Sequence, residues 1–289
     1  MLEILNKHSL KFFCLLIVLL GLNFTVWEDL ISSSPSEGLT VNFLNVGQGD
    51  SSLVILPGGV KLLIDGGRPD KKVLEELGEV LSANDRYLDL VLATHNDSDH
   101  LGGLVEVLNR YEVGAFLYNG REDNNLSHFV EVMKIAKEKN IPIISLEQGD
   151  KIKYIESVGS VLWPTPSVLT QKSTNEGSVV LKLSSGGVTS LFAGDISSKI
   201  ENSLKNILGE VDILKIPHHG SKYSSSAEFL NLLKPRLAVI EVGKNSYGHP
   251  TAEVLNRLAQ IGASLYRTDL DGRVMVKVLD RRLQIFKEN

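Results

Sequence analysis

Cysteine is nearly absent from this sequence of 289 residues, which contains only Cys14. A single thiol cannot form a disulfide within the chain, and it cannot build a structural zinc site from several thiolates. Any bound metal would therefore be held by histidine and carboxylate side chains, the ligands typical of catalytic centres.

Positive charge is also scarce, because 30 basic residues face 35 acidic ones and the formal net charge is −5. Proteins that coat nucleic acid usually carry an excess of basic side chains. The composition therefore excludes a general DNA-coating protein, although a metal site can supply local positive charge for an anionic substrate. The length and the 43% of hydrophobic residues suit one large globular domain or two small ones.

Long hydrophobic runs are confined to the N-terminus. Lys7, His8 and Lys11 precede an apolar run over residues 12–22, which continues less strictly to Trp27. A basic flank followed by an apolar core is how a secretory signal or a signal-anchor begins, and either one would place the rest of the chain outside the cytoplasm. We therefore expect an extracytoplasmic protein, either membrane-anchored through this segment or secreted.

The sequence divides into three predicted parts. Residues 1–31 are the N-terminal hydrophobic helix, a signal-anchor or signal peptide, and residues 32–38 are a linker rich in serine. Residues 39–289 are the globular domain, in which no internal repeat or low-complexity tract occurs.

Strands and helices alternate through the globular domain in two similar halves. Three short strands near residues 39–46, 52–56 and 60–64 open the first half, and helix–strand units follow. Four consecutive strands between Asp150 and Ala193 open the second half, further helix–strand units follow, and a last pair of strands closes the chain. This α/β order fits either two mixed sheets packed face to face with helices outside or one doubly wound sheet.

The densest cluster of possible metal ligands follows the predicted buried strand that ends at Ala93. Two imidazoles and two carboxylates occur close together here, from His95, Asp97, Asp99 and His100. Such a cluster at a strand end is unfavourable unless a cation neutralises it. On an irregular loop, alternate ligands can face two neighbouring metals, with the first pair on one ion and the second pair on the other.

Two further motifs present polar side chains directly after predicted strands. Asp195 follows Gly194, and its two carboxylate oxygens are suited to bridging two metals. His218 and His219 follow another strand. His218 comes first and is the predicted ligand, which leaves His219 to bind the substrate or to assist the leaving oxygen.

A last motif precedes the helix predicted to begin near Thr251. It contains Asn245, Tyr247 and His249, and polar groups at a helix N-terminus suit an anionic oxygen such as that of a phosphate. The alternative is a turn that only caps the helix. His128 has no polar company at the start of its helix and is predicted to be a surface residue.

These motifs, in this order, resemble those of the metallo-β-lactamase superfamily, in which a His-x-His-x-Asp-His loop precedes a bridging Asp and a final His. More narrowly, the sequence is similar to the hydrolase domain of ComEC-type DNA-uptake (competence) proteins, which have Asp in place of the second His, as Asp97 shows. The resemblance runs from Leu39 to the C-terminus. It includes residues 46–51, 63–67, 175–178, 218–221 and 247–250.

The resemblance implies an αββα sandwich and a site for two divalent metal ions, Mn²⁺ or Zn²⁺. The implied metal ligands are His95, Asp97, Asp99, His100, Asp195 and His218. The superfamily's usual third histidine for the first metal has no clear counterpart, so water would complete the shell of that ion. An oxygen-rich site of this kind fits Mn²⁺ as well as Zn²⁺, with a slight preference for Mn²⁺. Asp50 and Asp65 would orient the ligand histidines.

We therefore expect an extracytoplasmic metal-dependent hydrolase, with phosphodiesterase or nuclease activity on DNA by a metal-activated hydroxide as the leading function. The predicted catalytic residues are Asp99, His249, Tyr247 and His219. Two alternatives remain open. One is a hydrolase of another envelope substrate, such as a cell-wall phosphodiester or a β-lactam, and the other is a non-catalytic binding domain.

Four basic residues near the motifs would form a groove for DNA, namely Lys215, Lys222, Lys244 and Arg267. The large polytopic membrane channel of full-length competence proteins has no counterpart in a sequence with one hydrophobic segment. The resemblance therefore does not by itself imply a part in DNA uptake, and no protein partner is predicted.

Overall fold

The computed structural model describes residues 38–170 and 173–289. The predicted N-terminal helix and nearly all of the linker lie outside these ranges. Within the described ranges, no helix has both the length and the apolar character that crossing a bilayer requires.

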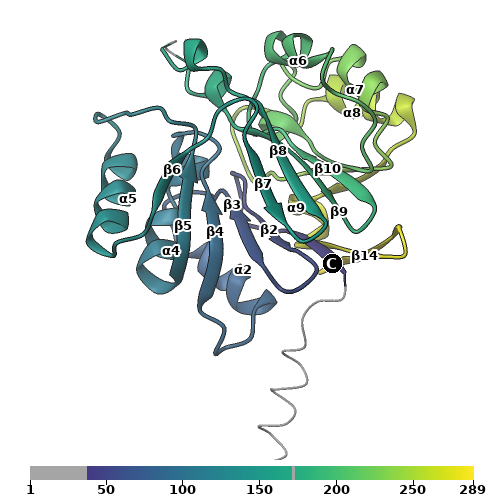
Figure 1. Cartoon of the computed structure of the whole chain (residues 1–289). Coiled ribbons are helices and arrows are strands. Elements are labelled where there is room, and N and C mark those ends of the chain that lie inside the picture. The colour runs from purple at the N-terminus through teal and green to yellow at the C-terminus, as the bar shows by residue number, and fades with distance from the viewer. Residues whose placement is uncertain (1–37, 171–172) are drawn as a thin grey trace, which may run out of the picture. The chain divides into compact units, whose positions relative to one another are not determined.

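The first sheet is built mainly by the first half of the globular domain (Figure 1). Its strands are β1 (Leu39–Phe43), β2 (Ser52–Ile55), β3 (Lys61–Ile64), β4 (Tyr87–Leu92), β5 (Glu112–Tyr118), β6 (Ile143–Ser145), β14 (Val274–Leu279) and β15 (Arg282–Lys287). The eight strands lie in the order β15-β14-β1-β2-β3-β4-β5-β6. Strands β3 to β6 are parallel, whereas the final hairpin pairs antiparallel with β1, so the chain end completes the first sheet.

The second sheet contains seven strands, which lie in the order β13-β12-β11-β10-β9-β8-β7. They are β7 (Lys151–Tyr154), β8 (Ser157–Trp163), β9 (Val180–Ser185), β10 (Val188–Phe192), β11 (Ile213–Lys215), β12 (Leu237–Ile240) and β13 (Ser264–Arg267). Strands β10 to β13 are parallel, and β7 to β10 form an antiparallel meander. All four side chains of β12 are buried, as expected for a parallel strand covered on both faces.

Helices cover the outer face of each sheet. The helices α2 (Lys72–Val80), α4 (Leu104–Arg110) and α5 (Ser127–Glu138) share a buried apolar core with the first sheet. The helices α6 (Ser198–Leu204), α7 (Ala227–Leu233) and α8 (Ala252–Ile261) share another with the second. A third core, which includes Phe43 and Phe192, fills the space between the sheets. The predicted sandwich of two mixed sheets with helices outside is therefore confirmed, and the doubly wound alternative is excluded.

The chain after Asp97 forms two short helices, α3 (Ser98–Leu101) and α4, and Gly103 between them packs against the backbone of Gly66. A Cβ at residue 103 would lie 2.0 Å from the Gly66 carbonyl oxygen, so the chain needs glycine there. Helix α6 was missed, since it is short and largely polar in sequence. A second short helix, α9 (Thr268–Asp271), follows β13.

Candidate metal centre

The first half contributes His95 and His100 from the segment after β4. Both side chains are fully buried, and their ring centroids are 4.2 Å apart. Helix α3 begins directly after Asp97 and returns the chain so that His100 stacks beside His95. The local turn thus brings two imidazoles that are five residues apart in sequence into contact.

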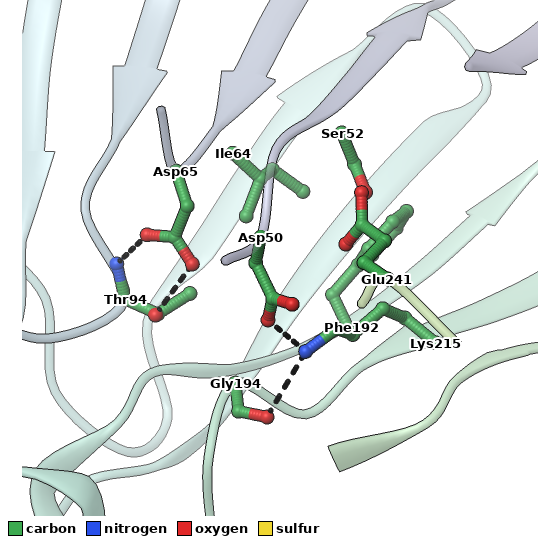
Figure 2. Close-up of a pocket in the computed structure, with 9 residues that line it drawn as sticks. All are labelled: Asp50, Ser52, Ile64, Asp65, Thr94, Phe192, Gly194, Lys215 and Glu241. Atoms are coloured by element: carbon green, nitrogen blue, oxygen red, sulfur yellow. Dashed lines mark hydrogen bonds and ion pairs between the residues drawn. The ribbon is translucent and has the colours of Figure 1, made fainter. Parts of the chain in front are cut away.

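Asp65, directly after β3, orients these imidazoles, and its hydrogen bonds to Thr94 are seen in Figure 2. Its carboxylate accepts hydrogen bonds from Nδ1 of His100 (2.9 Å) and from the backbone N–H and hydroxyl of Thr94 (2.7 Å each). Because the Thr94 hydroxyl donates to Asp65, it can accept from Nδ1 of His95 at 3.1 Å. Both imidazoles are then protonated on Nδ1, and their Nε2 lone pairs are left for a metal. Asp65 therefore lies where the sequence predicted an orienting carboxylate.

The second half contributes Asp195, which follows Gly194 after β10. Its Oδ2 atom lies 3.3 Å from Nε2 of His100, 3.6 Å from Nε2 of His219 and 3.7 Å from Nε2 of His218. Burial alone would raise the pKa of Asp195. Nearby histidines, above all His100 and His219, outweigh burial and hold that pKa well below its usual range. Asp195 is thus an ionised carboxylate at the point where the two halves meet.

His218 and His219 both project toward Asp195 from the 3-10 turn η3 (Pro217–Gly220). His219 is buried, donates from Nδ1 to the carbonyl oxygen of Glu241 at 2.9 Å, and places Nε2 3.5 Å from Asp99. The side chain of His218 is 28% exposed. A backbone carbonyl on Nδ1 is the usual support of a metal-binding histidine. His219 therefore meets the geometric requirements of a ligand better than His218. The sequence analysis had predicted His218 as the ligand, because it comes first after the strand.

Each of the two carboxylates of the loop faces an imidazole. Oδ2 of Asp97 lies 3.6 Å from Nε2 of His95, and Asp99 faces His219 from α3. Burial would raise the pKa of Asp99, but His219 and His100 lower it well below the ordinary range. Both carboxylates are therefore anionic donors available to a cation.

Several buried atoms of this cluster have no hydrogen-bond partner within the described ranges. They are Nε2 of His95, His100 and His219 and Oδ1 of Asp195. Leaving buried polar atoms unpaired costs free energy, and a divalent cation would satisfy all of them at once. Two groups of potential ligands fit such ions by distance. One is His95, His100 and Asp195, and the other is Asp50, His100 and His219. The residues present thus fit a His/Asp metal centre that accepts Zn²⁺ or Mn²⁺.

Asp50 is already paired with a cation of the chain itself. Lys215, from β11, donates from Nζ to Oδ2 of Asp50 and to the carbonyl oxygen of Gly194 at 3.3 Å (Figure 2). The other oxygen of Asp50 lies 3.1 Å from Nδ1 of His219. Asp50 therefore lies beside His219, but Nδ1 of that ring donates to Glu241, and the orienting role expected of Asp50 stays a prediction.

Lys215 corrects one expectation, because it was placed in an exposed basic groove and its side chain is only 3% exposed. It lines a small cavity of about 10 Å³, together with Glu241 and Asp50. Burial lowers the pKa of Lys215 and raises that of Glu241. Glu241 accepts from the Ser51 backbone N–H at 3.2 Å and from the Ser52 hydroxyl at 3.1 Å.

The motif near residue 249 lies at the open side of the centre. The ring of His249 meets that of His218 edge to face, with centroids 5.6 Å apart, and lies 5.8 Å from that of Tyr247. Tyr247 is 69% exposed. Asn245 uses its side chain within the loop, since it donates to the carbonyl oxygens of Gly243 and His249 and accepts from two backbone N–H groups. Asn245 is therefore a loop-forming residue, whereas His249 and Tyr247 remain available to a substrate.

One functional residue escaped the sequence analysis. The hydroxyl of Thr174 donates to Oδ1 of Asp97, and Thr174 lies directly before the 3-10 turn η2 (Asn175–Gly177). Nδ2 of Asn175 lies 3.5 Å from Nε2 of His218, and the hydroxyl of Ser178 accepts from the backbone N–H of Asp195. Residues 175–178 were noted only as part of a motif, and nothing in the sequence indicated that Thr174 would reach Asp97.

Comparison with known proteins identifies the family of this chain. A model of the metallo-β-lactamase superfamily matches residues 44–243. The chain is 29% identical to ComE operon protein 3 of Bacillus subtilis over 271 residues, which cover 85% of this chain and 34% of that protein. It is 29% identical to competence protein ComA of Neisseria gonorrhoeae over 291 residues, which cover 94% of this chain and 39% of that protein. The chain thus spans little more than a third of the length of these curated relatives.

Solved structures show the same fold. The metallo-β-lactamase fold protein YhfI from Bacillus subtilis superposes with a TM-score of 0.58 at 12% identity, covering 86% of this chain and 99% of that one. A diphosphatase of the PhnP family superposes with a TM-score of 0.52 at 15% identity, covering 83% of this chain and 98% of that one. At these identities the likeness concerns the fold alone.

Proposed function

The chain belongs to the metallo-β-lactamase superfamily, and we propose that it is a phosphodiesterase that cleaves DNA with the help of two divalent metal ions. The fold and the His/Asp centre support a metal-dependent hydrolase. The observation that carries the proposal is the convergence of unpaired buried Nε2 atoms from His95, His100 and His219 on the carboxylate of Asp195.

We assign the ligands from the distances between their donor atoms. His95, Asp97 and Asp195 would hold one ion. The second ion would be held by Asp99, His100, Asp195 and His219. His219 thus takes the ligand role that the sequence order gave to His218. The oxygen-rich first position favours Mn²⁺ slightly over Zn²⁺.

When bound, two such ions would supply a nucleophile at neutral pH and neutralise charge on a phosphodiester. The chain's own contribution is to orient and to bind. Asp65 accepts from Nδ1 of His100 and the carbonyl oxygen of Glu241 accepts from Nδ1 of His219, so that each Nε2 faces the centre. His218 and His249 line the open side and would contact the phosphate or protonate the leaving oxygen.

DNA is proposed as the substrate because the chain is similar along most of its length to a competence protein and to a recombination protein. The uptake role of those longer proteins is not carried over. An extracytoplasmic location is proposed from the basic and apolar pattern of residues 7–27. The candidates for contacts with the DNA backbone are Lys222, Lys244 and Arg267. Lys215 is buried and is no longer a candidate.

The test is metal-dependent cleavage by the purified full chain. Metal is first removed, Mn²⁺ or Zn²⁺ is added back, and single-stranded DNA, duplex DNA and a simple phosphodiester are compared. Asp99→Ala is the inactive variant, and Glu131→Ala, which changes an exposed carboxylate on α5, is the matched control.

DNA cleavage that is lost in Asp99→Ala and kept in Glu131→Ala is the expected result. Turnover of the simple diester alone would move the substrate to another envelope phosphodiester. Bound metal without any turnover would contradict the phosphodiesterase, and a chain that binds no metal would indicate a non-catalytic binding domain.

A further inference from the structure

We propose that Thr174 is a positioning residue that fixes which oxygen of Asp97 is offered to the first metal ion. This inference rests on the proposed metal-dependent function. Thr174 belongs to the connection between β8 and β9 in the second sheet, whereas Asp97 belongs to the loop after β4 in the first. A residue of one half thus controls a ligand of the other.

The contact divides the two oxygens of Asp97 between two tasks. Oδ1 accepts the hydrogen bond from the Thr174 hydroxyl, and Oδ2 lies 3.6 Å from Nε2 of His95. A free carboxylate can bind an ion with either oxygen or with both. With Oδ1 committed to Thr174, Asp97 presents a single oxygen on the side where His95 presents its nitrogen.

Asp97 needs such a constraint more than the other ligands do. Its side chain is 36% exposed, compared with 29% for Asp99 and 4% for Asp195. Packing fixes the buried ligands, but an exposed carboxylate rotates freely and is hydrated. A donor that holds it in one orientation lowers the entropy lost when the ion binds.

Thr174 is itself held firmly against the first half. The segment that contains it is tied by three hydrogen bonds, from Arg121 to the Ser173 carbonyl (3.2 Å), from Asn119 to the Gly177 carbonyl (3.0 Å) and from the Val179 N–H to the Thr94 carbonyl (2.8 Å). These bonds place the hydroxyl at Asp97 through the backbone, independently of any metal.

The Thr174 hydroxyl has one competing acceptor. Oδ1 of Asn175 lies 3.1 Å away, but it is a neutral amide oxygen. An ionised carboxylate is the stronger acceptor, so the single proton of the hydroxyl points to Asp97. The side chain of Asn175 is instead directed to His218, with its Nδ2 atom 3.5 Å from Nε2.

The experiment measures metal binding by the full chain, not its activity. Mn²⁺ and Co²⁺ are titrated by calorimetry into the metal-free protein, and the Co²⁺ absorption spectrum reports the ligand set. Thr174→Val removes the hydroxyl and Thr174→Ser keeps it. Thr170→Val is the matched control, because the Thr170 hydroxyl donates only to the Ser167 carbonyl within the same connection.

In Thr174→Val we expect one of two ions to bind about 10- to 100-fold more weakly, as for other residues that orient metal ligands. The Co²⁺ spectrum should change for that ion only. Thr174→Ser and Thr170→Val should bind both ions as the unaltered chain does. Two ions bound by Thr174→Val with unaltered affinity and spectrum would overturn the inference.

A double-mutant cycle separates positioning from a general structural role. In an Asp97→Ala background, Thr174→Val should have no further effect on metal affinity, because the carboxylate that the hydroxyl positions is gone. An equal loss in both backgrounds would overturn the inference. If Thr174→Val does not fold, Thr174→Ala takes its place in the same cycle. An unaltered chain that binds no metal would instead overturn the proposed function, so the two failures are distinguishable.

Discussion

The two halves of the sandwich supply the metal centre in different ways. The first half places its four ligand side chains between His95 and His100, on one loop and the short helix α3. The second half supplies Asp195 and the pair His218 and His219 from the ends of two separate strands, β10 and β11. One group is thus assembled by a local turn and the other by the sheet.

The register of the sheet explains how the second group meets. Strands β10 and β11 are parallel, and Phe192 pairs with Lys215. Asp195 and His218 each lie three residues beyond this pair, so equal advance along neighbouring strands brings them to the same place. A contiguous motif depends on its own turn, whereas a dispersed one depends on the whole fold. Metal binding should therefore be more sensitive to substitutions of the ligands from the second half than to substitutions of those from the first.

The largest test of this comparison sets Asp195→Ala against Asp97→Ala. Asp195 contacts three histidines, whereas Asp97 faces only His95 among the histidines. We expect Asp195→Ala to lose both ions and to reduce hydrolysis by about 1,000-fold, equivalent to about 4 kcal/mol. Asp97→Ala should weaken one ion and cost less. Metal stoichiometry and turnover measure both effects, and a greater loss in Asp97→Ala would reverse the ranking of the halves.

A second test concerns the ion pair that joins the halves behind the centre. Lys215→Met leaves Asp50 buried without its cation, and we expect a loss of about 3 kcal/mol in the free energy of unfolding. Urea unfolding measures this loss. Lys234→Met, which breaks an exposed pair with Glu210, is the control and should leave the free energy of unfolding nearly unchanged.

Asp50→Asn should recover part of the Lys215→Met loss, because it removes the unpaired buried charge. The opposing result is that Lys215→Met lowers the free energy of unfolding equally in the unaltered chain and in Asp50→Asn. That result would show that the two halves are not joined electrostatically.

The sequence predicted the first half of the site better than the second. Clustered imidazoles and carboxylates after a buried strand can be recognised without knowing the fold, and His95 to His100 do converge. The choice between His218 and His219 could not be made in this way, because both adopt positive φ angles of 53° and 52° that turn the chain back. The hydrogen bond from Thr174 was also hidden, since Asp97 lies 77 positions away in the chain.

The fold was predictable where apolar periodicity is strong. The opening strands β1, β2 and β3 and the buried strand β4 lie close to where the sequence placed them. The break between α3 and α4 depends on how closely the backbones of Gly103 and Gly66 approach, which no local pattern records. Helix α6 buries only part of its short length, so its periodicity is weak.

The smallest expected effect on the free energy of unfolding comes from a change at Glu201 on α6. Glu201 is a buried carboxylate of the second half, outside the metal centre. Burial raises its pKa above the ordinary 4.5, although the backbone N–H groups of Ser226 and Ser225 act in the opposite direction. A raised pKa in the folded state stabilises the protein fully below the unfolded pKa and ceases to do so as pH rises through the folded pKa. Asp195, whose pKa is lowered, has the opposite dependence.

In Glu201→Gln this contribution is removed. The free energy of unfolding of the variant, relative to the unaltered chain, should therefore rise between pH 4 and pH 7. Urea unfolding of the metal-free proteins at several pH values measures the difference. If the difference does not change with pH, Glu201 does not titrate differently on folding, and the pH dependence of stability then belongs to other groups.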